Sequence, residues 1–223
     1  MLISKQRRFI FAANTKTAST AIEEALEPHA NRRLKGSPRR KHLPLARVEA
    51  ALPQMFAKTP FHRFFRFGVM REPVDWIVSW FRYRKQQRVE DPLPDTMTFA
   101  EFWERGDWNI RRADGSPYLQ SDIFAAADGT CLADVILPYH DVEPGLRAIC
   151  ETLDIPFDGL PRRNVSPARI AAPEIDAAMT ETLRAHYAAD YALWERLEAL
   201  NADGMARLRA DRAGARSPGQ SAP

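Results

Sequence analysis

Three apolar runs of strand length occur in the first two-thirds of the chain, and a segment with helical spacing follows each one. The runs lie at 8–13, 64–70 and 133–137. Continuous apolar runs this short are typical of strands that are buried on both faces. The segments with helical spacing lie at 20–27, 73–87 and 142–153. Strands alternating with helices predict an α/β fold, in which a sheet of parallel strands is flanked by helices.

The same patterns assign the remaining segments. Helical spacing indicates further helices at 45–56, 98–105, 118–126 and 173–200, with a candidate break at 186–191. Thr20 and Glu23 fit a capping box at the start of the first helix. Basic residues with Gly36, Pro38 and Pro44 predict a long loop at 31–45, and 161–167 reads as a polar loop. Gly, Ser, Pro, Arg and Ala dominate from Asn201 onward, so we expect one domain at 1–200 and a disordered tail at 201–223.

Composition limits the classes of partner. The net charge of the 223 residues is +3 and the pI is near 9.0, with basic clusters at 32–41 and 82–88. Such clusters either bind anions or form solvated surface. No nucleic-acid reader motif accompanies them, so nucleic acid is not an expected partner. Cys131 and Cys150 form no CxxC pair, and no apolar segment approaches the ~20 residues of a membrane span, so we expect reduced thiols and a cytoplasmic protein.

The first candidate site lies where the strand at 8–13 meets the helix that follows. The loop there carries Lys16 and the hydroxyl side chains of Thr17, Ser19 and Thr20. Free N–H groups at a helix start, together with a lysine and hydroxyls, are suited to binding a phosphate. The alternative is a plain strand–helix turn. The loop contains no glycine and does not match GxxxxGK[ST], which disfavours an ordinary nucleoside triphosphatase.

The second candidate site follows the strand at 64–70. Arg71 ends the strand, Pro73 fits the first position of a helix, and Ser79 lies eight residues after the arginine. Ligands of α/β sheets bind at the carboxyl ends of the strands, where Arg71 is expected. The alternatives are a local ion pair between Arg71 and Glu72, and a hydrogen bond from Ser79 to its own helix.

Together the two segments resemble the nucleotide-binding motifs of sulfotransferases that use 3′-phosphoadenosine-5′-phosphosulfate (PAPS). Residues 15–20 resemble the 5′-phosphosulfate loop of the carbohydrate sulfotransferase branch, and residues 71–81 resemble its 3′-phosphate segment. Weaker matches lie at 41–42, 120–121, 134–137 and 161–167, so the resemblance covers roughly 8–170. It implies a fold like that of the P-loop NTPases and transfer of a sulfuryl group from PAPS to a hydroxyl acceptor, such as a carbohydrate, without a metal.

The resemblance also implies roles for particular residues. Lys16 is the expected catalytic residue that stabilises charge on the leaving group. The residues expected to bind PAPS are Lys16, Thr17, Ala18, Ser19, Thr20, Arg71, Ser79, Arg163, Asn164 and Ser166. The chain departs from the family at Ala18, where relatives often have glycine, and at His140, where they often have an acid. Gln120 is expected to face the donor or the acceptor.

The base that takes the proton of the acceptor is expected to be His42, because Lys41 and His42 resemble a Lys-His pair of the family. His140, Glu23 and Glu24 are alternatives. Two other functions stay open. One is an atypical P-loop kinase, which the missing glycines disfavour, and the other is a catalytically inactive nucleotide-binding or interaction protein of the same fold.

Overall fold

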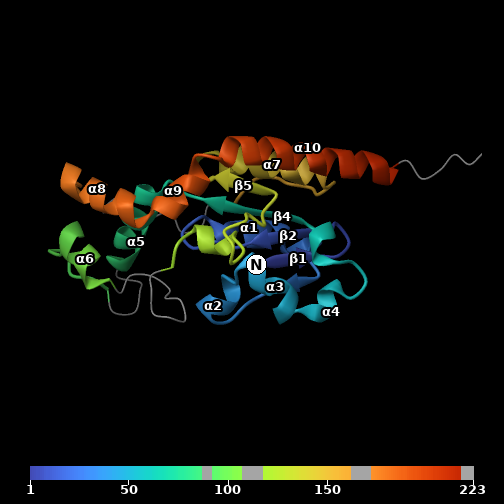
Figure 1. Ribbon diagram of the computed structural model, residues 1–223. Helices are drawn as coiled ribbons and strands as arrows, with labels where there is room; N and C mark the ends of the chain where they lie inside the picture. Colours follow the sequence, from blue (N-terminus) through green and yellow to red (C-terminus); the bar gives the residue numbers. More distant parts are fainter. Residues whose placement is uncertain (87–91, 107–117, 162–171, 217–223) are drawn as a thin grey trace, which may run out of the picture.

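One five-stranded sheet forms the centre of the protein, and helices cover both of its faces (Figure 1). The computed structural model describes residues 1–86, 92–106, 118–161 and 172–216. The strands are β1 (Leu2–Ser4), β2 (Phe9–Ala12), β3 (Arg32–Arg33), β4 (Phe65–Met70) and β5 (Val135–Pro138). The predicted α/β class, a sheet flanked by helices, is confirmed.

The prediction of a wholly parallel sheet is wrong at one edge. The strand order is β3-β1-β2-β4-β5, and β2, β4 and β5 are parallel, as expected. β1 pairs antiparallel with both β2 and β3. Neither β1 nor β3 was predicted, because three and two residues are too few to show a periodic pattern. β3 lies in the basic segment that was predicted to be a loop.

The helices follow the strands in the expected alternation. They are α1 (Ser19–Leu26), α2 (Pro38–Lys41), α3 (Leu45–Ala51), α4 (Pro53–Phe56), α5 (Pro73–Arg84), α6 (Phe99–Arg105), α7 (Val142–Thr152), α8 (Ala177–His186), α9 (Ala188–Trp194) and α10 (Leu197–Arg216). Single 3₁₀ turns occur at Glu27–His29, Phe61–Arg63, Ser121–Ile123 and Tyr139–Asp141.

Alternate side chains of the central strands enter different cores. Phe9 and Phe11 of β2 pack with α1, α7 and α10 on one face, whereas Ile10 packs with α3 and α4 on the other. Figure 1 shows α7 and α10 together on one side of the sheet, with α3 and α4 on the opposite side. A third apolar cluster joins α5, α6 and α8 beyond the end of the sheet, around the buried Trp76 and Tyr187.

Several predicted helices differ from those observed, and the one at 173–200 is divided into α8, α9 and the start of α10. The helix at 45–56 is divided at Leu52, because the residue before a proline is disfavoured in the α region. The helix at 118–126 is only the 3₁₀ turn Ser121–Ile123. The predicted capping box of α1 does not form: Ala18 is the N-cap residue, without a side-chain hydrogen bond. Glu23 instead pairs with Arg33 and Lys41.

The disordered tail predicted from Asn201 is wrong over 201–216, which belong to α10. The Asn201 side chain accepts a hydrogen bond from Ile136 N at 2.7 Å and donates one to Ile136 O at 2.8 Å. Gly204 lies against the backbone of Asp134, where a Cβ atom would come within 1.8 Å of the carbonyl oxygen. α10 is therefore docked on β5, which its composition did not indicate.

Candidate functional site

The backbone of the loop between β2 and α1 leaves N–H groups free for an anion. Lys16 and Ala18 are left-handed, with φ of 58° and 56°, whereas Thr17 between them is not. Left-handed residues in a tight loop are a feature of backbone nests, in which successive N–H groups turn toward a common point. The first helical bond from α1 back into the loop runs from Ile22 N to Ala18 O at 3.1 Å. The N–H groups of the first α1 residues therefore have no partner four residues back, and they lie at the positive end of the helix.

Internal hydrogen bonds fix this loop. Thr15 N donates to Asn14 Oδ1 at 2.8 Å, and the Thr17 hydroxyl donates to Asn14 O at 3.1 Å. Trp76 of α5 reaches across to donate its Nε1 proton to Thr15 O at 2.9 Å. Because the Thr17 hydroxyl proton is already used, Thr17 offers an anion its backbone N–H group.

Lys16 lies among aromatic rings, and its charge is not neutralised by any described residue. Its Nζ is 3.8 Å from the ring centroid of Tyr83 and 5.9 Å from that of Trp80. No carboxylate among the described residues lies within ion-pair distance of it. Burial and the positive charge of Arg71 lower the pKa of Lys16 to about 8. The amine is therefore mostly protonated at neutral pH, without a counter-ion in the described part of the chain.

Arg71 lies at the carboxyl end of β4, as predicted, and its charge also lacks a described counter-ion. Its guanidinium carbon is 3.6 Å from the ring centroid of Tyr139, which follows β5 directly. The Nε atom of Arg71 is buried and has no hydrogen-bond partner among the described residues. The local ion pair with Glu72 considered above does not form, because Glu72 accepts from Asp75 N and from the Tyr191 hydroxyl. The fold thus brings together two cations, about 55 residues apart in sequence, that are not neutralised by a described carboxylate.

His42 and Lys41 contact the two ends of the same loop. His42 Nδ1 is 2.7 Å from Ala13 O. Because a carbonyl can only accept, Nδ1 carries the proton, and Nε2 of the neutral ring keeps its lone pair. Burial lowers the pKa of His42 to about 4, so the ring is neutral at pH 7. Lys41 Nζ donates to Thr20 Oγ1 at 2.9 Å, which joins α2 to the first turn of α1.

The other candidate bases are differently placed. Glu23 is fully buried and contacts Arg33, Lys41 and the amine of Met1. Glu24 is half-buried on α1. His140 is exposed, with its Nε2 3.2 Å from Asp141 Oδ2.

Some predicted contacts are only partly located. Ser79 is half-buried on α5, one residue before Trp80, and its hydroxyl forms no hydrogen bond within the described chain. Its pairing with the same phosphate as Arg71 stays a prediction. Arg163, Asn164 and Ser166 lie outside the described residues.

Three residues that shape the site were not predicted from the sequence. Tyr83 and Tyr139 provide the rings against which Lys16 and Arg71 lie, and Asn14 fixes the loop. Tyr139 was detectable, because it follows the third parallel strand at the edge where ligands bind. The expectation that Gln120 faces the donor or acceptor is wrong, since its side chain is fully buried against the backbone of Arg71.

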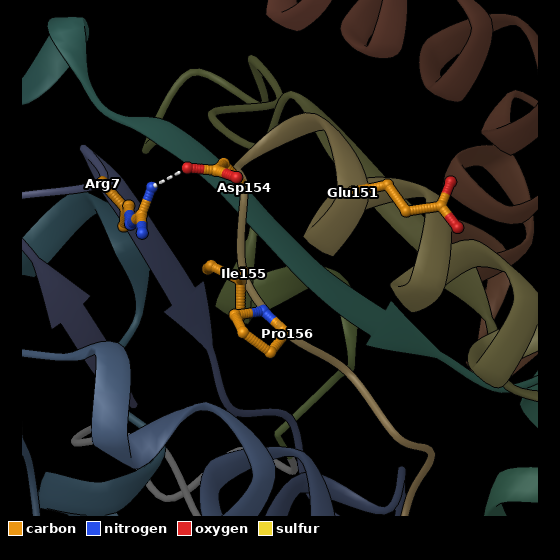
Figure 2. A pocket seen from close by; sticks show the side chains of 5 residues that line it. All are labelled: Arg7, Glu151, Asp154, Ile155 and Pro156. Carbon is orange, nitrogen blue, oxygen red and sulfur yellow. Dashed lines mark hydrogen bonds and ion pairs between the residues drawn. The ribbon is translucent and has the colours of Figure 1, made fainter.

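A hollow elsewhere on the surface is lined by Arg7, Glu151, Asp154, Ile155 and Pro156 (Figure 2). It lies at the amino-terminal end of the parallel strands, away from Lys16 and Arg71, because Arg7 precedes β2 and the other four residues lie at the end of α7 or after it. Arg7 and Asp154 form an ion pair of 2.9 Å across it. None of the predicted site residues that the structure describes lines this hollow.

Within the described residues, no group of three or more His, Cys, Asp or Glu side chains is arranged to hold a metal ion. None of the helices described is both long and apolar enough to cross a membrane. Comparisons of the chain with protein-family models, with curated proteins and with solved structures find no match.

Proposed function

We propose that this protein is a sulfotransferase that moves the sulfuryl group of PAPS to a hydroxyl acceptor, such as a carbohydrate. One observation carries the proposal. Lys16 and Arg71, at the ends of neighbouring parallel strands, lie close enough for the charge of Arg71 to lower the pKa of Lys16, and no described carboxylate neutralises either one. Two neighbouring cations without a counter-ion in the described part of the chain favour a ligand with two separate anionic groups.

The residues have distinct roles in this proposal. The N–H groups from Thr17 to Thr20 bind the 5′-phosphate, and Lys16 neutralises charge that grows on the leaving oxygen. Arg71 binds the 3′-phosphate, for which its planar fork of donors is suited. Ser79 is the second proposed ligand of that phosphate. The fold of the P-loop NTPases, with its strand–loop–helix phosphate site, is proposed on the same grounds.

His42 is the proposed base. Its Nε2 lone pair accepts the proton of the acceptor hydroxyl while the acceptor oxygen bonds to sulfur and the bond from sulfur to the 5′-phosphate oxygen breaks. The products are a sulfate ester and 3′-phosphoadenosine-5′-phosphate. The bond from Nδ1 to Ala13 O fixes the ring in the tautomer that this step needs. A bound anion next to the ring favours the protonated form that results.

The proposal is tested by sulfuryl transfer. The protein is incubated with PAPS labelled in the sulfuryl group and with a set of neutral and acidic oligosaccharides, and labelled products are separated and counted. We expect transfer to at least one acceptor and a loss of about 10²–10³-fold in kcat for Lys16→Met, the scale seen when a charge-stabilising donor is removed. Donor binding without transfer would favour an inactive nucleotide-binding protein, and Mg²⁺-dependent turnover of ATP would favour a kinase.

A further inference from the structure

Gln120 contacts both anion-binding motifs, although it belongs to neither. Its fully buried side chain accepts hydrogen bonds at Oε1 from Arg71 N at 3.0 Å and from Asn14 Nδ2 at 3.2 Å. Its Nε2 donates to Arg71 O at 2.9 Å. The amide thus pairs with both backbone groups of Arg71, as a neighbouring strand would, and binds Asn14 with the same oxygen.

Asn14 continues this connection into the phosphate loop. Its Nδ2 also donates to Val69 O at 3.1 Å, and its Oδ1 accepts from Thr15 N at 2.8 Å. Asn14 is itself fully buried. Two buried amides therefore fix the position of the loop that carries Lys16 relative to the end of β4 that carries Arg71.

A third segment holds Gln120 in place. Asp190 of α9 is fully buried and accepts hydrogen bonds from Gln120 N at 3.0 Å and from Ser121 N at 2.7 Å. Phe124, at the end of the same segment, lies over Gly68 of β4, where a Cβ atom would come within 2.4 Å of the ring. Buried polar networks with every partner in place specify one geometry. Here that geometry includes the backbone of Arg71.

We propose that Gln120 is a positioning residue that holds Arg71 at the distance from the phosphate loop required by a nucleotide with phosphates at both ends. The inference rests on the proposed function and deepens it by assigning recognition of the second phosphate to Gln120 acting through Arg71. Gln120 has no contact with the ligand in this assignment, because its amide already bonds to the protein on both sides.

The test compares two nucleotides that differ only in the 3′-phosphate. The dissociation constants of adenosine 5′-monophosphate and 3′-phosphoadenosine-5′-phosphate are measured by calorimetry. The constant of the monophosphate divided by that of the bisphosphate is the ratio that reports how strongly the 3′-phosphate is bound. We expect Gln120→Met to lower this ratio by about tenfold, the scale of one charged hydrogen bond, while binding of the monophosphate changes little. In an Arg71→Ala background the same substitution should leave the ratio unchanged.

Asn201→Leu is the matched control. Asn201 holds both backbone groups of Ile136 on β5 in the same way, but on a strand that carries neither cation. Its loss should lower the melting temperature and leave the ratio unchanged. If Gln120→Met does not fold, Gln120→Glu is the second variant. Its side chain keeps the shape and the hydrogen bond from Arg71 N, but an ionised carboxylate cannot donate to Arg71 O. This variant should therefore also lower the ratio.

The outcomes separate the inference from the function on which it rests. A folded Gln120 variant with an unchanged ratio overturns the positioning role and leaves the proposed function intact. A similar fall in the ratio in Asn201→Leu also overturns the positioning role, because a general loss of stability would then explain the effect. If the unmodified protein binds neither nucleotide, the proposed function fails and the positioning role falls with it.

Discussion

Binding of a phosphate-bearing nucleotide should weaken as the pH rises through the titration of Lys16. Burial and the neighbouring Arg71 lower the pKa of this lysine to about 8. A lysine with a lowered pKa is charged below that value and neutral above it. The protonated fraction falls from about nine-tenths at pH 7 to about one-tenth at pH 9, so affinity should fall about tenfold over this range if the bound anion needs the charge.

Calorimetry with 3′-phosphoadenosine-5′-phosphate between pH 7 and 9 measures this slope, and Lys16→Arg is the matched control. An arginine stays charged throughout the range, so its affinity should be nearly flat whatever its absolute value. All other titrating groups are shared by the two proteins. An equal slope in both proteins, or none in the unmodified protein, would refute the assignment of Lys16 to the anion site.

Three further substitutions test other parts of the structure. His42→Ala should lower turnover by about 10²–10⁴-fold with nucleotide binding retained. Substitution of the exposed His62 by Ala should leave turnover unchanged. Near-normal turnover of His42→Ala would show that His42 is not the base. Ala18→Gly should raise the free energy of unfolding by about 0.5–1 kcal/mol, because φ at this position is 56°. Ala21→Gly inside α1 should lower the free energy of unfolding. A decrease in stability at both positions in urea titrations would contradict the loop geometry. Gly204→Ala should lower the free energy of unfolding by about 1–3 kcal/mol or more, because the new methyl group overlaps Asp134 O. Gly214→Ala should be neutral or stabilising, because a methyl group there meets no described atom within 4 Å. Equal melting temperatures of the two variants would show that α10 is not docked on β5.

The parts of the fold that were predicted share one physical property. β2, β4 and β5 carry mainly apolar side chains on both faces, so their burial is visible in a single segment of sequence. β1 and β3 owe their existence to main-chain pairing with partners elsewhere, which leaves no pattern in two or three residues. α10 was missed for a related reason: Asn201 and Gly204 dock it on β5 through contacts that only the folded chain supplies.

The candidate site also has residues that the sequence indicates and others that only the folded chain reveals. Lys16 and Arg71 were predicted because strand ends and helix starts place such residues at one edge of a parallel sheet. His42 was predicted only from the resemblance of Lys41 and His42 to a Lys-His pair of the sulfotransferases. The burial of Gln120 was not predictable, because its partners lie about 50 and 105 residues away in sequence. The pKa of Lys16 likewise depends on the approach of Arg71, which follows from the register of β2 and β4.

The central claim is that Lys16 and Arg71 form one site for a nucleotide with phosphates at both ends. Calorimetric measurement of the binding of 3′-phosphoadenosine-5′-phosphate tests this claim most directly. The unmodified protein is compared with Arg71→Ala and with Arg63→Ala, an exposed arginine of the turn Phe61–Arg63, and ATP is the competitor. We predict a dissociation constant on the order of micromolar for the unmodified protein. Arg71→Ala should raise it by about 10–100-fold, the scale of lost charged hydrogen bonds, whereas Arg63→Ala should leave it unchanged. An equal concentration of ATP, which lacks the 3′-phosphate, should not displace the ligand. Absence of binding to the unmodified protein, or equal binding to Arg71→Ala, would contradict the claim.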